Sequence, residues 1–191
     1  SIKTTNSDVS KVSDEVRVAA IRTVEKKIGI TLTKKSNTFY IGVRDTCVLM
    51  IFSRTYSRKN FLEFWYGFHM KHKKELERHE SSYIAYGAYE EGFLFLIPYK
   101  IMCELLPYCN TTINANSYYW HIKLYKDNAK AYTKIRGDET YNLDAYLLEF
   151  SNDFEAGPIE KAQNSTNSTE ITTKKNKIIL GQGIHEVKIK K

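Results

Sequence analysis

The chain is organised around residues 60–80, which include the run LEFWYGFHMKHKK at positions 62–74. Residues 62–68 are apolar and aromatic and predict a strand, and residues 69–74 add two histidines and three lysines. A second aromatic and basic segment, YYWHIK, follows at residues 118–123. Two strands that place aromatic rings, a histidine and lysines side by side favour a flat and negatively charged partner, which points to nucleic acid.

The alternation of side chains along residues 62–68 separates two faces of the predicted strand. Period-two geometry places Leu62, Phe64, Tyr66 and Phe68 on one face, which we expect to be core. Trp65 lies on the other face, where it is either covered by a helix or open as a stacking platform. Residues 47–52, by contrast, are six consecutive apolar residues, so this strand is expected to be central and covered on both faces.

The hydrophobic pattern predicts the element order α-β-β-β-α-β-β-α-β-β-α without an internal repeat. Helices are expected at residues 14–28 (between a Ser13 cap and Gly29), 69–80, 98–106 and 143–150, and strands at 38–43, 47–52, 62–68, 81–88, 93–97, 118–125 and 129–135. Residues 109–117 are expected to form a polar loop. The fold class predicted is α+β, with a mixed or mostly antiparallel sheet and three to four helices.

Composition divides the chain into three parts. Residues 1–155 are expected to form the α+β domain, residues 156–176 a polar linker-like tract, and residues 177–191 a basic terminal strand or tail. A domain of this size can bury about 70% of its unfolded surface, so it can fold without disulfides or a structural metal.

The charge is unevenly distributed along the chain. The formal net charge is +7, but from Lys174 onward six lysines face one acid, so residues 1–173 carry only +2 of it. The domain is therefore locally basic, which keeps nucleic acid open as a partner. A protein-interaction domain with an incidental, solvated lysine tail is an alternative, and a homodimer is also left open.

Targeting signals and cysteines suggest a compartment. No apolar run approaches the 18 or so residues needed to span a bilayer, and residues 1–6 have no secretory apolar core, so we expect a cytoplasmic protein without a signal peptide or a membrane partner. The three cysteines, Cys47, Cys103 and Cys109, form no CxxC pair, and reduced thiols are expected.

A nucleic-acid interface can be assembled from the aromatic and basic side chains of three segments. These are the loop at residues 53–60, the segment at 69–74 and the strand at 118–123. Bases would stack on Tyr56, Trp65 and Tyr119, phosphates would contact Arg54, Arg58, Lys59, Lys71, Lys73 and Lys123, and His69 and His121 would donate hydrogen bonds.

Metal binding and catalysis have weaker patterns. His69, His72 and His79 lack a cysteine or carboxylate at ligand spacing, so solvated histidines and no resident metal or other cofactor are expected. The alternative of a metal-dependent restriction-type endonuclease would use Glu186 and Lys188 with Mg²⁺. There is no nucleophile elbow, P-loop or GxGxxG motif to support another enzyme class.

Five short segments resemble a pattern found in bacterial and archaeal proteins associated with restriction systems. They are SRTY at residues 53–56, FWYGF at 64–68, IP at 97–98, NTT at 110–112 and YWHI at 119–122. The resemblance covers about residues 50 to 125 and assigns no functional residue. It implies DNA as the partner, and it leaves open whether the chain cuts DNA or only recognises it.

Overall fold

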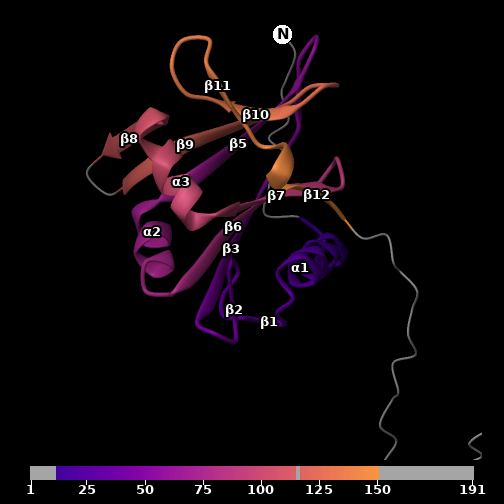
Figure 1. Cartoon of the computed structure of the whole chain (residues 1–191), viewed down its shortest axis with the longest axis vertical. Helices are drawn as coiled ribbons and strands as arrows, with labels where there is room; N and C mark the ends of the chain where they lie inside the picture. The colour runs from indigo at the N-terminus through magenta and orange to yellow at the C-terminus, as the bar shows by residue number, and fades with distance from the viewer. Residues whose placement is uncertain (1–11, 115–116, 151–191) are drawn as a thin grey trace, which may run out of the picture. The chain divides into compact units, whose positions relative to one another are not determined.

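The computed structural model describes residues 12–114 and 117–150, which form three α-helices, two 3-10 helices and twelve strands (Figure 1). The helices are α1 (Asp14–Ile28), α2 (Met70–Leu76), α3 (Tyr99–Leu105), η2 (Leu106–Tyr108) and η3 (Asp144–Tyr146). The strands are β1 (Leu32–Lys34), β2 (Phe39–Gly42), β3 (Thr46–Ser53), β4 (Tyr56–Ser57), β5 (Leu62–His69), β6 (Ser81–Ala88), β7 (Phe93–Pro98), β8 (Asn110–Asn114), β9 (Ser117–Lys126), β10 (Ala131–Lys134), β11 (Thr140–Asn142) and β12 (Leu147–Glu149). The α+β class is confirmed.

The strands form two sheets. Sheet A has the order β1-β2-β3-β6-β7-β12, and all its neighbours are antiparallel except β3 and β6. A parallel pair requires a crossover connection, because the chain must return to the same end of the sheet. Residues 54–80 supply this crossover, and they contain β4, β5 and α2. The chain therefore leaves sheet A after β3, and residues 62–69 form a strand of the second sheet.

Sheet B is antiparallel throughout and is built around the two segments that stand out in the sequence. Its order is β11-β10-β9-β5-β4, and β8 also pairs with β9. Strands β5 and β9 pair over eight residues, from Leu62 opposite Lys126 to His69 opposite Tyr119. The predicted side-by-side placement of residues 62–68 and 118–123 is confirmed.

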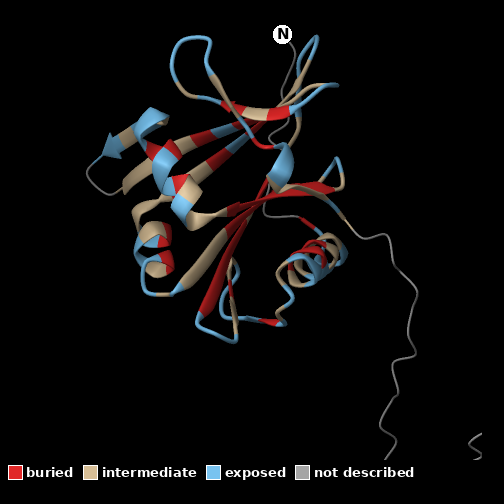
Figure 2. Ribbon diagram, viewed as in Figure 1, coloured by how far each residue is buried: buried red, intermediate tan, exposed pale blue. Residues whose placement is uncertain are grey.

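Two hydrophobic clusters hold the layers together. Between the sheets, Leu49 and Ile84 of sheet A belong to the same buried cluster as Phe64, Tyr66 and Ile122 of sheet B. This cluster also includes Leu76 of α2 and Met102 of α3, so these two helices contribute to the core between the sheets. The buried residues run mainly along the strands that form this core (Figure 2).

Helix α1 covers the other face of sheet A. Ala20 and Val24 are fully buried in the cluster that contains Val48 and Met50 of β3. The helix begins where Ser13 accepts a hydrogen bond from the backbone N–H of Val16 (3.3 Å), and it ends at Gly29 with a left-handed φ of 69°. The predicted bounds of this helix and the two-sided burial of β3 are confirmed.

Several local predictions were wrong. One sheet was expected, but the described residues form two. Residues 110–114 form β8 rather than a loop, because they pair with β9 as a hairpin. Residues 143–150 form η3 and β12 rather than a helix, because residues 147–149 complete the edge of sheet A beside β7. The short strands β1 and β11 were missed, as was β4, which lies within the expected loop at residues 53–60. The predicted linker and tail, residues 156–191, lie outside the described residues.

Candidate nucleic-acid interface

The face of sheet B that points away from the sandwich carries a set of aromatic and polar side chains. Cross-strand register places Glu63 opposite Tyr125, Trp65 opposite Lys123, Gly67 opposite His121 and His69 opposite Tyr119. Their sequence neighbours Phe64, Tyr66 and Phe68 point into the core and are buried. Because side chains alternate between the two faces of a strand, burial of one set leaves the other set outside. We call this surface the outer face of sheet B.

Four rings on this face form a continuous aromatic row. His69 stacks on Tyr119 with a centroid distance of 5.0 Å, and Tyr119 lies 4.9 Å from His121. The His121 ring is in turn 5.6 Å from Trp65, whose side chain is 38% exposed. The question of whether Trp65 is covered or open is therefore settled, because it is exposed and absent from both hydrophobic clusters.

Hydrogen bonds lock the orientation of His121. The indole Nε1–H of Trp65 donates to His121 Nδ1 at 3.2 Å, and His121 Nε2 lies 2.6 Å from the hydroxyl oxygen of Thr112. Because an indole can only donate, Nδ1 must be the unprotonated nitrogen, and Nε2–H donates to Thr112. Both ring nitrogens are therefore used within the protein, and the surface that His121 offers a ligand is its ring face.

The prediction that the other histidines are solvated was wrong. His72 is 5% exposed, packs edge-on against Phe39 at 6.0 Å, and accepts a hydrogen bond at Nδ1 from the backbone N–H of His69 (3.1 Å). Burial, followed by the nearby His69 and Lys71, lowers the pKa of His72 to about 4. Burial also lowers the pKa of His69. Both imidazoles are therefore neutral near pH 7.

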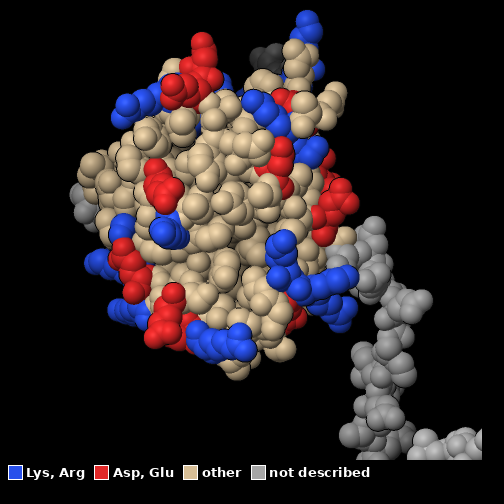
Figure 3. All heavy atoms as spheres, in the orientation of Figure 1, with Lys and Arg blue, Asp and Glu red and all other residues tan. Residues whose placement is uncertain are grey.

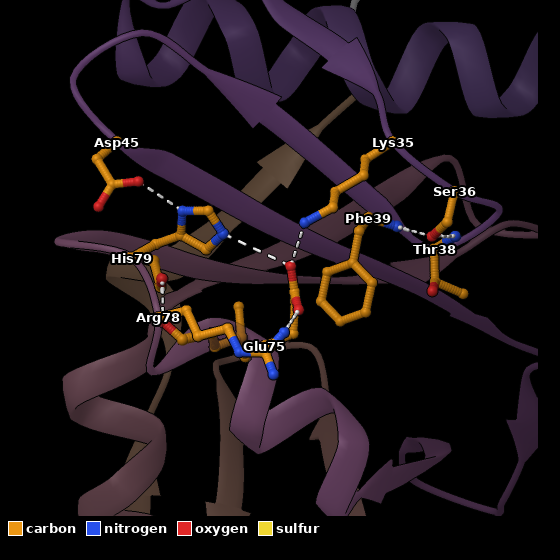
Figure 4. A network of polar contacts seen from close by, with 10 residues as sticks. Lys35, Ser36, Thr38, Phe39, Asp45, Glu75, Arg78 and His79 are labelled. Atoms are coloured by element: carbon orange, nitrogen blue, oxygen red, sulfur yellow. Dashed lines mark hydrogen bonds and ion pairs between the residues drawn. The ribbon is translucent and has the colours of Figure 1, made fainter.

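The third histidine belongs to a polar network that joins the β2–β3 turn to the end of α2 (Figure 4). His79 Nδ1 lies 2.6 Å from Asp45 Oδ1, and His79 Nε2 lies 3.6 Å from Glu75, which also pairs with Lys35 and Arg78. Hydrogen bonds from His79 and from the Glu80 backbone lower the pKa of Asp45. The network has a structural explanation, since it connects two elements packed on the core.

The basic side chains predicted to contact phosphate are only partly available. Arg58 and Lys123 both lie beside Glu63, at 3.3 and 3.9 Å, and Lys73 pairs with Glu77 on α2. Arg58, Lys59, Lys71 and Lys123 are all exposed, and of these Lys59, in the turn before β5, and Lys71, in the first turn of α2, form no ion pair with a described residue. Arg54 is half-buried just before β4, and Tyr56, 42% exposed, lies on β4 opposite Glu63.

 A notch opens on the outer face of sheet B beside the aromatic row. The notch has a volume of about 190 Å³, and a separate cavity of about 370 Å³ lies elsewhere, between α1 and sheet A. The notch is lined by Tyr108, Cys109, Asn110, His121, Lys123, Tyr125, Thr133 and Lys134.

Most residues of the notch were not among the predicted site residues. Only His121 and Lys123 were named from the sequence, because residues 109–117 were expected to be a loop and the residues at 131–134 were not assigned to a face. Tyr132 lies opposite Tyr125 and stacks on it at 5.3 Å, which places β10 beside the same surface. Assigning faces to residues 131–134 by their alternation would have pointed to Lys134.

Charge on the molecule is mixed rather than uniformly basic. On the face shown in Figure 3, acidic and basic side chains surround a broad uncharged area, and a dense group of basic side chains lies over α1. On the outer face of sheet B, Glu63 lies beside both Arg58 and Lys123. A nucleic-acid interface there would depend on ring contacts and a few cations rather than on a large positive field.

The two residues of the nuclease hypothesis, Glu186 and Lys188, lie outside the described residues. Within residues 12–114 and 117–150, no group of three or more His, Cys, Asp or Glu side chains could hold a metal ion. None of the helices in these same ranges is long and apolar enough to span a membrane.

Comparisons with known proteins do not assign the fold to a family. No protein-family model, curated protein or solved structure in the three comparisons matches the chain. The candidate function therefore rests on the residues of the outer face of sheet B.

Proposed function

We propose that the chain binds nucleic acid, and more specifically DNA, through the outer face of sheet B. The observation that carries the proposal is the aromatic row, in which an exposed Trp65 continues a series of rings across two paired strands. Stacking of a base on an aromatic side chain contributes about 1 to 3 kcal/mol. An open sheet face with aligned rings suits this contact, because bases can lie flat against it.

The cations around the row would contact the phosphate backbone. Lys59 and Lys71 are exposed, and Lys123 lies on the face itself. Because Glu63 lies beside both Arg58 and Lys123, the net charge of the face is modest. We therefore expect binding to weaken with salt less steeply than for a protein that neutralises about 6 to 10 phosphates.

DNA is favoured over RNA by the resemblance of residues 50 to 125 to proteins associated with restriction systems. On this basis the chain would serve as the recognition part of a restriction or defence system. The Mg²⁺-dependent endonuclease with Glu186 and Lys188 stays a prediction, as does the interaction domain with an incidental lysine tail.

The test is binding of a labelled single strand and its duplex to the full chain over a salt series, with and without Mg²⁺. Trp65→Ala removes the exposed ring, and Arg58→Glu with Lys59→Glu reverses two charges at the β4–β5 turn. The matched control is Lys26→Glu with Lys27→Glu, since these lysines are exposed on α1, which covers sheet A and not sheet B. A variant with the six lysines from Lys174 onward changed to Gln tests the tail.

We expect the sheet B variants to weaken binding about tenfold and the control to change it much less. Loss of binding in the tail variant alone, with Trp65→Ala equal to the parent, would contradict the proposal and support the interaction-domain alternative. A cleaved product that requires Mg²⁺ and disappears in Glu186→Ala would support the nuclease.

A further inference from the structure

The notch exists because two strands share one edge of β9 and then diverge. Strand β5 occupies the other edge of β9 along its whole paired length. Strand β8 pairs with β9 residues 117–121, and β10 pairs with residues 125–126. Residues 122–124 of β9 lie between these two paired segments and pair with neither β8 nor β10. There, Thr133 Oγ1 donates a hydrogen bond to the Lys123 carbonyl at 2.8 Å. The notch lies in this fork.

The size of the notch limits what it can hold. At about 190 Å³ it is smaller than the roughly 300 to 1,000 Å³ of sites for drug-sized ligands. It lies between the start of β8 on one side and β10 on the other, so a double helix cannot enter it. A single ring or a single phosphate group matches this space.

The lining favours an anion with a planar group attached. Lys123 and Lys134 both line the notch, and none of its eight lining residues is an acid. Lys134 Nζ lies 5.4 Å from the centroid of the Tyr125 ring, and the Arg136 guanidinium lies 5.4 Å from that of Tyr108. These cation–π contacts hold both cations beside the notch. Tyr108 is 40% exposed, so part of its ring is open to a ligand.

We propose that the notch receives the phosphate of one unpaired nucleotide at Lys123 and Lys134, while the base of that nucleotide lies against the exposed ring of Tyr108 at the rim. This inference rests on the proposed function, and it deepens it by naming the substrate class. A nucleotide held in the notch must leave the base stack and its pairing partner, which costs a few kcal/mol in an intact duplex and least where the base is already unpaired. The outer face of sheet B therefore selects single strands, or duplexes with an unpaired nucleotide.

The test measures affinity of the full chain for three labelled DNAs: a single strand, its perfect duplex, and the same duplex with one bulged nucleotide. The variants are Lys134→Gln, Tyr108→Ala and, as a conservative rescue, Lys134→Arg. The control is Lys26→Gln on α1, and circular dichroism checks that each variant is folded. We expect the parent to bind the single strand and the bulged duplex about tenfold more tightly than the perfect duplex.

We expect Lys134→Gln and Tyr108→Ala to weaken binding of the single strand and the bulged duplex about three- to tenfold. Binding of the perfect duplex should stay unchanged in both variants. Lys134→Arg should restore most of the affinity that Lys134→Gln loses. If the parent binds all three DNAs equally and the notch variants match it, the inference is overturned while the proposed function stands. If the parent binds no DNA, the proposed function fails and the inference with it. If Tyr108→Ala does not fold, Lys134→Gln decides.

Discussion

Sheets A and B differ in how they are covered. In β3 of sheet A seven of eight residues are buried, because α1 packs on one face and sheet B on the other. In β5 of sheet B the buried residues are Phe64, Tyr66 and Phe68, and the residues between them are half-buried or exposed. The two strands are equally long and both contribute to the core between the sheets, so the difference lies in their second faces.

This difference separates residues that are constrained by packing from residues that are open to a ligand. A strand covered on both faces has no side chains to offer a ligand, and each of its residues is constrained by packing. The outer face of sheet B is free of that constraint, so it can carry rings and cations whose contribution to stability is small. Adjacent residues on β5 should therefore respond very differently to substitution.

The largest expected effect compares Phe64 with its neighbour Trp65. Phe64 is fully buried, with ring centroids 5.5 Å from Phe93 and 6.0 Å from Phe95, so Phe64→Ala should lower the free energy of unfolding by about 3 to 5 kcal/mol. Trp65→Ala should lower it by about 1 kcal/mol, because the ring is exposed and loses mainly its hydrogen bond to His121. Urea unfolding measures both. Equal losses would refute the division between the two faces.

The next effect is a pH dependence from His72, which lies at the margin of the core. Its pKa of about 4 in the folded protein is below the roughly 6.5 of an unfolded chain, so between these values the unfolded state binds more protons. Stability should therefore be full above about pH 6.5 and fall by roughly 3 kcal/mol as the pH drops to 4. His72→Asn, which keeps an acceptor but does not titrate, should lose most of this dependence in unfolding experiments at several pH values. An unchanged pH profile would argue against a buried, neutral His72.

A smaller effect compares one glycine in each sheet. A Cβ at Gly87 in sheet A would lie 2.4 Å from Cδ1 of Phe52, so Gly87→Ala should cost about 1 to 3 kcal/mol. A Cβ at Gly67, on the outer face of sheet B, would lie no closer than 3.3 Å to the His69 ring, so Gly67→Ala should cost about 1 kcal/mol or less. Thermal unfolding of the two variants distinguishes them, and a greater loss from Gly67→Ala would reverse the comparison.

The smallest effect concerns Glu63, the acid on the outer face of sheet B. Removing its charge with Glu63→Gln frees Arg58 and Lys123 from a competing carboxylate, so affinity for single-stranded DNA at low salt should rise about two- to fivefold. Fluorescence anisotropy of a labelled strand measures the change, with Glu15→Gln on α1 as the control. Weaker binding by Glu63→Gln would indicate that Glu63 organises the cations rather than opposing them.

Several features of the candidate site could be predicted because they depend on local periodicity. The alternation in residues 62–68 assigned Phe64, Tyr66 and Phe68 to the core. The similar alternation in residues 118–125 indicated a second aromatic strand beside it. The state of His72 could not be predicted this way, because its burial arises from contacts with Phe39 and Phe68 of two other elements. The pairing of Lys73 with Glu77, by contrast, follows helical spacing.

The sequence by itself determined the α+β class, the first helix with its caps, and the burial of β3, because each depends on residues close together in the chain. Only the tertiary structure decided that the strands divide into two sheets, that Trp65 is exposed, and that β8 and β10 diverge to leave a notch. The physical reason is that periodicity shows which face of a strand is apolar, whereas the partners that cover the other face come from distant parts of the chain.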